Sequence, residues 1–121
     1  PVTLKRAMQD IEKSVGKGCV GVNLDPANLL MYGKANPVDA LDVFGEYVRG
    51  IHGKDGKYPT DGHFLGEEVS IGQGKVNYPV FIARLKEVGY DGDITIEREI
   101  SGEEQKKDIL AGKEYLEQLI G

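Results

Sequence analysis

Three residues that commonly bind divalent metals, Asp25, His52 and Glu97, each stand at or near the end of a short run with strand character. Two carboxylates and an imidazole form a mixed oxygen and nitrogen ligand set, which suits Mn²⁺, Mg²⁺, Co²⁺, Fe²⁺ or Zn²⁺. We therefore predict that these residues bind one divalent ion, provided that the fold brings the three strand ends together.

The order of elements predicts such a fold. β-branched and apolar residues indicate strands at 19–25, 49–55 and 93–99. Helical spacing and start signals such as Asn36-Pro37 and Ser101 with Glu104 predict the helices at 3–15, 36–48, 77–88 and 101–119. Helices that alternate with strands indicate βα units around a parallel sheet.

Strand alternation separates an apolar face from a polar one. Val22 and Leu24 alternate with Asn23 and Asp25, and the other two strands follow the same scheme. A doubly wound open sheet would need two apolar faces, whereas the interior mouth of a β/α barrel accepts a polar one. The predicted fold class is α/β, with parallel βα units of a barrel, and the three ligands share its inner face.

Each ligand also has a structural interpretation. Asp25 precedes Pro26 and could start a turn, and His52 could be a hydrogen-bonded core histidine. Glu97 has no simple structural explanation, because a carboxylate within a strand is costly unless it is paired. The agreement of all three in face and strand end favours the metal site.

Residues 56–76 form a connection that is too long for an ordinary βα link, so we predict a substrate loop there. Gly72 and Gly74 could allow a ligand to approach the backbone closely. Lys54 and Asp55, just before this loop, are either substrate-binding residues or ordinary loop charges. Arg98 lies on the helix side by alternation, where a structural salt bridge is expected.

Composition limits the class of protein. The 121 residues suffice for a single domain, 1–121, with a formal net charge of −5, which argues against a nucleic-acid partner. Cys19 is the single cysteine, so we expect no intramolecular disulfide and a buried thiol. The absence of a long apolar run predicts no membrane span, and together these features favour a cytoplasmic location.

Four segments, GVNLDPANLLMYG (21–33), GIHGKDG (50–56), IGQGKV (71–76) and LKEVGYDGDITIERE (85–99), resemble the sugar-phosphate isomerase/epimerase family of xylose-isomerase-like TIM barrels. The resemblance runs from about Cys19 onward and keeps the order and spacing of the motifs.

The resemblance implies one divalent metal, held by Glu, Asp, His and Glu from successive strands, of which Asp25, His52 and Glu97 match the last three. Glu97 would also be one of two glutamates that exchange protons with substrate carbon. The three strands would be the sixth to eighth of the barrel, so the chain resembles a C-terminal part, and we expect little activity from it alone. Asn28 stands where some relatives carry a substrate-contacting His.

The implied substrate is a sugar or a sugar phosphate, with an inosose-type dehydratase of the same fold as the alternative. DNA-repair endonucleases share the barrel but need more His and Asp ligands and a basic surface, whereas this chain is acidic with two histidines. A third alternative is a non-catalytic barrel fragment. Exposed barrel edges would then pair with other copies, and we expect a homo-oligomer.

Overall fold

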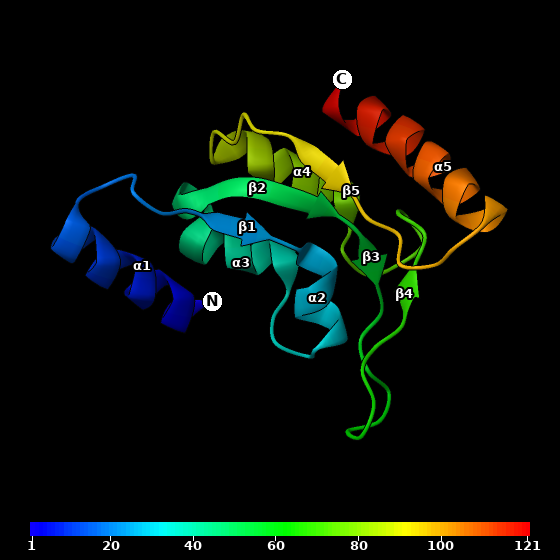
Figure 1. Cartoon of the computed structure of the whole chain (residues 1–121), viewed down its shortest axis with the longest axis horizontal. Helices are drawn as coiled ribbons and strands as arrows, with labels where there is room; N and C mark the ends of the chain where they lie inside the picture. The colour runs from blue at the N-terminus through cyan, green and yellow to red at the C-terminus, as the bar shows by residue number, and fades with distance from the viewer.

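The computed structural model describes residues 1–121 and has a parallel sheet of three strands flanked by helices (Figure 1). The strands are β1 (Val22–Leu24), β2 (Val48–Gly53) and β5 (Ile94–Ile96), in the order β1-β2-β5, and both pairings are parallel. The α/β prediction with parallel βα units is confirmed, although each strand is shorter than predicted.

Five α-helices accompany the sheet: α1 (Val2–Val15), α2 (Pro26–Met31), α3 (Pro37–Phe44), α4 (Tyr78–Glu87) and α5 (Glu103–Ile120). The helix predicted over 36–48 is shorter, because a 3₁₀ turn, η1 (Gly45–Tyr47), leads directly into β2. The Asn36 side chain caps α3 by accepting from the N–H groups of Val38 and Asp39. Helix α2 was not predicted.

The two faces of the sheet differ as the alternation predicts. Val22, Leu24 and Ile51 are buried with Leu41 and Phe44 of α3 and Phe81 of α4 in the main core. In Figure 1, α3 and α4 lie behind β1 and β2. Asn23 and Thr95 point to the other face and are exposed. The helix layer therefore covers one face, and the polar face remains open for chemistry.

The predicted substrate loop contains a small hairpin. Strands β3 (Asp55–Gly56) and β4 (Glu68–Val69) pair antiparallel, and residues 57–67 project between them as an arm (Figure 1). Arg98 anchors the base of the arm through ion pairs with Glu68, at 2.9 Å, and Asp108, at 2.8 Å. The structural salt bridge predicted for Arg98 is confirmed.

Two local predictions are wrong. The capping box of Ser101 and Glu104 does not form, because Gly102, with a φ of 85°, occupies the N-cap of α5 and no side chain caps the helix. Cys19 is exposed instead of buried, because it lies in the link between α1 and β1, outside the core. No helix has both the length and the apolar character needed to cross a membrane.

Candidate metal centre

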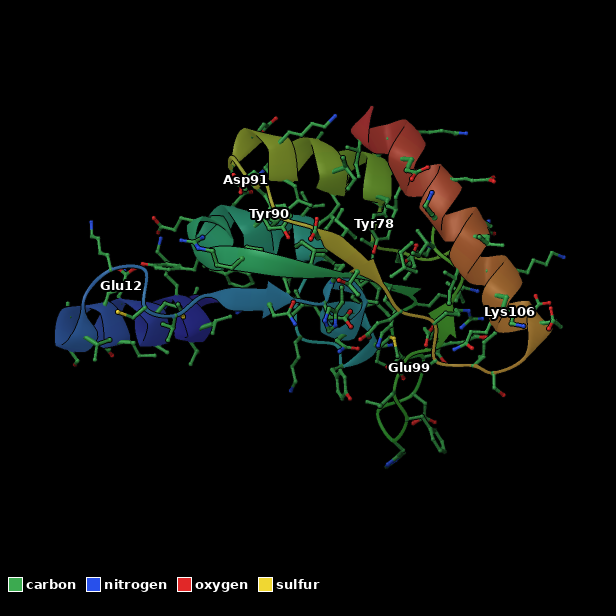
Figure 2. All side chains as sticks on the ribbon, turned by 45° about the horizontal axis from the view of Figure 1, so that its top comes forward. Glu12, Tyr78, Tyr90, Asp91, Glu99 and Lys106 are labelled. Atoms are coloured by element: carbon green, nitrogen blue, oxygen red, sulfur yellow. The ribbon has the colours of Figure 1, made fainter.

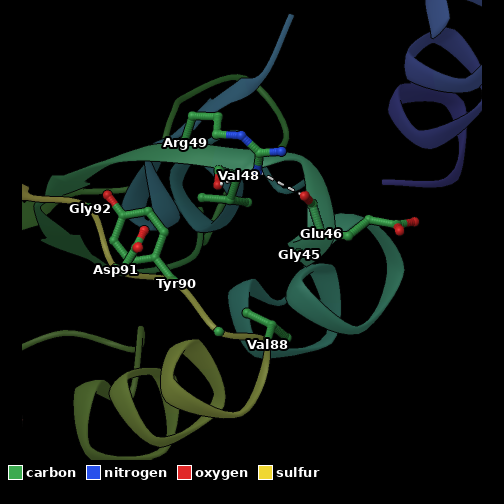
Figure 3. Close-up of a pocket in the computed structure, with 9 residues that line it drawn as sticks. Gly45, Glu46, Val48, Arg49, Val88, Tyr90, Asp91 and Gly92 are labelled. Atoms are coloured by element: carbon green, nitrogen blue, oxygen red, sulfur yellow. Dashed lines mark hydrogen bonds between the residues drawn. The ribbon is translucent and has the colours of Figure 1, made fainter. Parts of the chain in front are cut away.

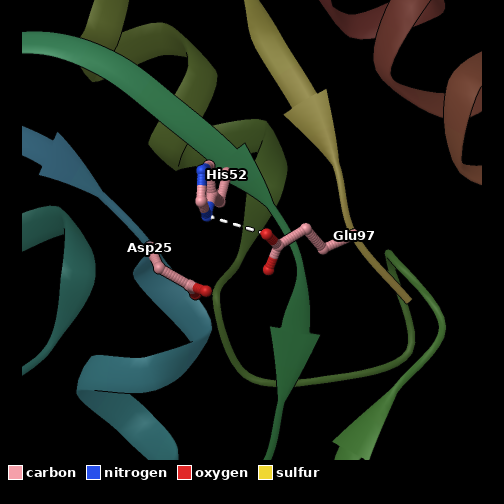
Figure 4. A group of neighbouring side chains, drawn as sticks. All are labelled: Asp25, His52 and Glu97. Atoms are coloured by element: carbon pink, nitrogen blue, oxygen red, sulfur yellow. Dashed lines mark ion pairs between the residues drawn. The ribbon is translucent and has the colours of Figure 1, made fainter. Parts of the chain in front are cut away.

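Asp25, His52 and Glu97 come together at the ends of three neighbouring strands (Figure 4). Asp25 directly follows β1, His52 is near the end of β2, and Glu97 directly follows β5. Each offers a ligand atom, and these atoms all lie within 4.8 Å of one another. The parallel register produces this arrangement, since the Glu97 N–H extends the β2–β5 ladder by donating to the Gly53 carbonyl at 2.9 Å.

Asp25 uses its two oxygens differently. Its Oδ1 accepts from the Asn28 N–H at 3.0 Å and caps α2, with Pro26 at the first helical position. Its Oδ2 is buried and has no hydrogen-bond partner, with the Lys54 ammonium 3.3 Å away. The turn and ligand interpretations of Asp25 are therefore compatible, because one oxygen shapes the backbone and the other faces the site.

Both ring nitrogens of His52 have neighbours. Nδ1 lies 3.1 Å from Glu97 Oε1, and Nε2 lies 3.0 Å from the side-chain amide of Asn23. Sequence analysis placed Asn23 on the inner face but did not single it out. Its position two residues before Asp25 on the same strand face is the signal that could have identified it.

Lys54 is 2% exposed, so it is not an ordinary loop charge. Its ammonium lies 2.8 Å from Glu99 Oε1 and 3.7 Å from Glu97 Oε2, in addition to the Asp25 contact. Burial disfavours this charge, but the Glu99 hydrogen bond and the Asp25 charge outweigh burial and raise the pKa of Lys54. The same contact lowers the pKa of Glu99, which lies just beyond β5 (Figure 2). Lys54 therefore holds a positive charge beside two of the candidate ligands.

Asp55 is also buried, at 1% exposure, but its carboxylate is fully engaged by the backbone. Oδ1 accepts from the N–H groups of Gly56 and Val76, and Oδ2 accepts from those of Gly72 and Gly74. The structure thus brings Asp55, Gly72 and Gly74 together as a loop anchor. Their contact with a substrate stays a prediction.

Asn28 lies in α2, and its recorded link to the cluster is the main-chain bond to Asp25. A separate cavity of about 140 Å³ is lined by residues that include Glu46, Val48, Arg49 and Asp91 (Figure 3). Val48 and Arg49 begin β2, whereas His52 lies near its end, so this cavity belongs to the opposite end of the sheet.

Comparison with known proteins assigns the fold to a family. Residues 2–119 match the family described as xylose isomerase-like TIM barrel. The chain belongs to this family. A crystal structure of a xylose isomerase domain protein from Planctomyces limnophilus matches 95% of the chain with a TM-score of 0.84 and 38% identity. A xylose isomerase domain protein from Alicyclobacillus acidocaldarius, at 22% identity and a TM-score of 0.57, supports the fold alone.

Two curated relatives are themselves uncharacterised. The protein MJ1311 of Methanocaldococcus jannaschii is 32% identical over 113 residues, and YfiH of Bacillus subtilis is 28% identical over 119 residues. The alignments cover 92% and 84% of this chain but 36% and 38% of those proteins, and 43% of the Planctomyces chain. The chain therefore spans less than half the length of the relatives that it matches.

The cluster has features that fit a divalent ion. Asp25 Oδ2 is buried, accepts no hydrogen bond and lies 3.3 Å from the Lys54 ammonium. A carboxylate oxygen has more than one lone pair, so it can bind a metal ion in addition to this ion pair. The set of two carboxylates and one imidazole suits borderline and hard divalent metals. Asp25, His52 and Glu97 are the residues that would hold the ion.

Proposed function

We propose that the protein to which this chain belongs is a divalent-metal-dependent isomerase or epimerase acting on a sugar or sugar phosphate. The observation that carries the proposal is the convergence of Asp25, His52 and Glu97 at the strand ends of a xylose isomerase-like fold. In parallel β/α barrels this end carries the chemistry. A bound metal would polarise the carbonyl and hydroxyl oxygens of the substrate.

Glu97 is the proton-transfer residue of this proposal. Its side chain is 36% exposed and reaches the open face of the sheet. A carboxylate there can take a proton from the carbon beside a substrate carbonyl and return one. The second glutamate of the family resemblance would come from an earlier strand, outside these 121 residues.

Lys54 supplies a fixed positive charge next to Glu97 Oε2, at 3.7 Å. Its ammonium has three donors, so it can bind a substrate oxygen while it remains paired with Glu99. This charge would stabilise negative charge that develops on oxygen as the carbon loses its proton. Asn28, Gly72 and Gly74 complete the proposed substrate-binding set, and Asp55 contributes by holding Gly72 and Gly74 in place. We further propose a cytoplasmic protein that self-associates through the edges of β1 and β5, each of which has one paired neighbour.

Exchange of substrate hydrogen with solvent tests the function. The complete protein, supplied with Mn²⁺ in D₂O, is incubated with a panel of aldoses, ketoses and their phosphates. We expect deuterium at the carbon next to the carbonyl of one substrate class, together with the isomeric product, both followed by proton NMR. Glu97→Gln should slow this exchange at least about 100-fold, because general acid–base catalysis contributes at least that factor.

Glu103→Gln provides the matched control, since Glu103 is an exposed glutamate in the first turn of α5. It should leave the exchange rate unchanged. A product that has lost one water would indicate the dehydratase alternative, and equal exchange by wild type and Glu97→Gln would contradict the proposed role of Glu97. Rapid isomerisation by the 121-residue chain alone would refute the requirement for a second glutamate.

A further inference from the structure

Asn23 contacts the candidate metal centre through the His52 ring. Its side-chain amide lies 3.0 Å from His52 Nε2, on the side of the ring opposite to the Nδ1 that faces Glu97. The side-chain hydrogen bond that Asn23 makes is this one with the His52 ring. The contact therefore acts on the orientation of the ring.

Gly50 makes room for this contact. Gly50 pairs with Asn23 across β1 and β2, and a Cβ at position 50 would lie 2.8 Å from Asn23 Oδ1. A larger residue there would push the amide away from its place. The strand pair thus accommodates the amide at the position from which it reaches His52.

We propose that Asn23 is a positioning residue that holds the His52 ring with Nδ1 toward the metal site. The proposal rests on the metal site of the proposed function. Histidine ligands usually bond their second ring nitrogen to a fixed partner, which sets the tautomer and the ring orientation. Here the ring would bind the ion through Nδ1, and Nε2–H would donate to the Asn23 side chain.

An amide suits both states of the ring. Without metal, Nδ1–H can donate to Glu97 while Nε2 accepts from the Asn23 NH₂ group. If Nδ1 held the ion, the ring proton would lie on Nε2, and a rotation of the amide would present its oxygen instead. The two ends of an amide have the same shape, so this exchange needs no further space. Asn23 therefore supports His52 before and after an ion binds.

Zinc titration by calorimetry and nitrogen-15 NMR of the His52 and His63 rings test the proposal on the complete protein to which this chain belongs. Asn23→Leu keeps the approximate size of the side chain and removes its hydrogen bond. We expect zinc affinity to fall about 10- to 100-fold. Asn23→Asp retains an acceptor for Nε2–H and should restore binding. In the zinc-bound wild type, His52 should show a protonated Nε2 that exchanges slowly with solvent, and this signal should be lost in Asn23→Leu.

His63 serves as the internal control, because it lies in the exposed arm and its ring should not respond. Unchanged zinc affinity and an unchanged His52 spectrum in Asn23→Leu would overturn the proposal, as would a bound His52 protonated at Nδ1. Failure of the wild type to bind zinc would count against the metal site instead. The metal-free spectra then decide the role of Asn23, since slowly exchanging Asn23 amide protons that vanish in His52→Ala support the contact, and fast exchange overturns it.

Discussion

Asp55 and Asp25 are two nearly buried aspartates near the same end of the sheet, with opposite surroundings. Asp55 accepts from the N–H groups of Gly56, Gly72, Gly74 and Val76, so both of its oxygens are occupied. Asp25 satisfies one oxygen with the Asn28 N–H and leaves the other without a hydrogen bond. A carboxylate whose oxygens all accept backbone bonds builds a loop. The second Asp25 oxygen accepts no hydrogen bond and faces the cationic Lys54, at 3.3 Å, so it can also bind a metal ion.

Replacing the Asp55 carboxylate should have the largest effect on stability. Each oxygen serves two N–H groups, so the amide of Asp55→Asn would turn its NH₂ toward two donors in either orientation. Buried donors that lose their acceptor cost about 1–3 kcal/mol each, and we expect a total near 3 kcal/mol. Urea unfolding followed by circular dichroism measures this loss of unfolding free energy.

Asp61→Asn is the control for this change. Asp61 lies in the exposed arm and accepts from the His63 N–H at 2.8 Å, a bond that an asparagine oxygen can also accept. Its cost should stay below about 0.5 kcal/mol. A loss smaller than 1 kcal/mol in Asp55→Asn would show that the loop does not depend on this carboxylate.

The next largest loss of stability should follow substitution of Gly74, which lies against Asp55. A Cβ at Gly74 would collide with Asp55 Oδ1 and approach the Gly56 carbonyl oxygen, and the latter is rigid backbone. Gly74→Ala should therefore destabilise the chain by about 2 kcal/mol, as overpacking commonly does. Gly62→Ala in the arm meets nothing within 4 Å and should cost almost nothing. Equal midpoints in a thermal melt of the two variants would argue against a tight anchor.

A smaller loss of stability is expected when Tyr78, which bonds to the backbone of Lys54, loses its hydroxyl. The Tyr78 hydroxyl donates to the Lys54 carbonyl at 2.7 Å and accepts from the Lys54 N–H at 3.0 Å. Tyr78→Phe removes both bonds within a buried site and should cost about 1–2 kcal/mol. Tyr115→Phe, a half-buried tyrosine on α5, should change stability little. Comparable losses in both variants would contradict this role of the Tyr78 hydroxyl.

Alkaline pH should reduce the difference in unfolding free energy between wild type and Tyr78→Phe. Burial raises the pKa of Tyr78 above its ordinary value of 10.0. Above pH 10, the folded state therefore keeps the Tyr78 hydroxyl protonated while the unfolded state ionises. The contribution of this hydroxyl to stability is complete below pH 10 and is lost as the pH rises further. Unfolding free energies measured at pH 8 and pH 11 should show this convergence, and a gap that widens would exclude it.

Sequence patterns predicted the cluster of Asp25, His52 and Glu97 better than the loop anchor. Alternation along a strand decides which side chains share a face, so Asp25, His52 and Glu97 could be placed before any coordinates. The bonds from Asp55 to Gly72 and Gly74 depend on how the loop returns, and no local periodicity encodes that path.

Local sequence patterns also failed to predict short elements and helix caps. Helix α2 has six residues, too few to show a period, so only its Asp25-Pro26 start was visible, and it was interpreted as a turn. The Ser101 capping box failed because Gly102 takes the N-cap in a conformation that favours glycine. Asn23 was visible on the inner face, but its contact with His52 needs the register of β1 against β2.

The smallest effect on stability should come from Asp25, where the effect on metal binding should be large. Asparagine caps a helix about as well as aspartate, so Asp25→Asn can retain the bond from the Asn28 N–H. Its NH₂ group would then face the Lys54 ammonium, which keeps its hydrogen bond to Glu99, at 2.8 Å. We therefore expect the unfolding free energy to fall by about 1 kcal/mol, the lower end of the range for a buried donor that loses one acceptor. Zinc affinity measured by calorimetry should fall at least about 100-fold, or about 2.7 kcal/mol, because a ligand oxygen and its charge are lost.

Asp39→Asn, which changes an exposed acid in the first turn of α3, should leave both stability and zinc affinity unchanged. If Asp25→Asn instead lowers the unfolding free energy as much as Asp55→Asn does and binds zinc normally, Asp25 is an anchor like Asp55, and the distinction between the two aspartates fails.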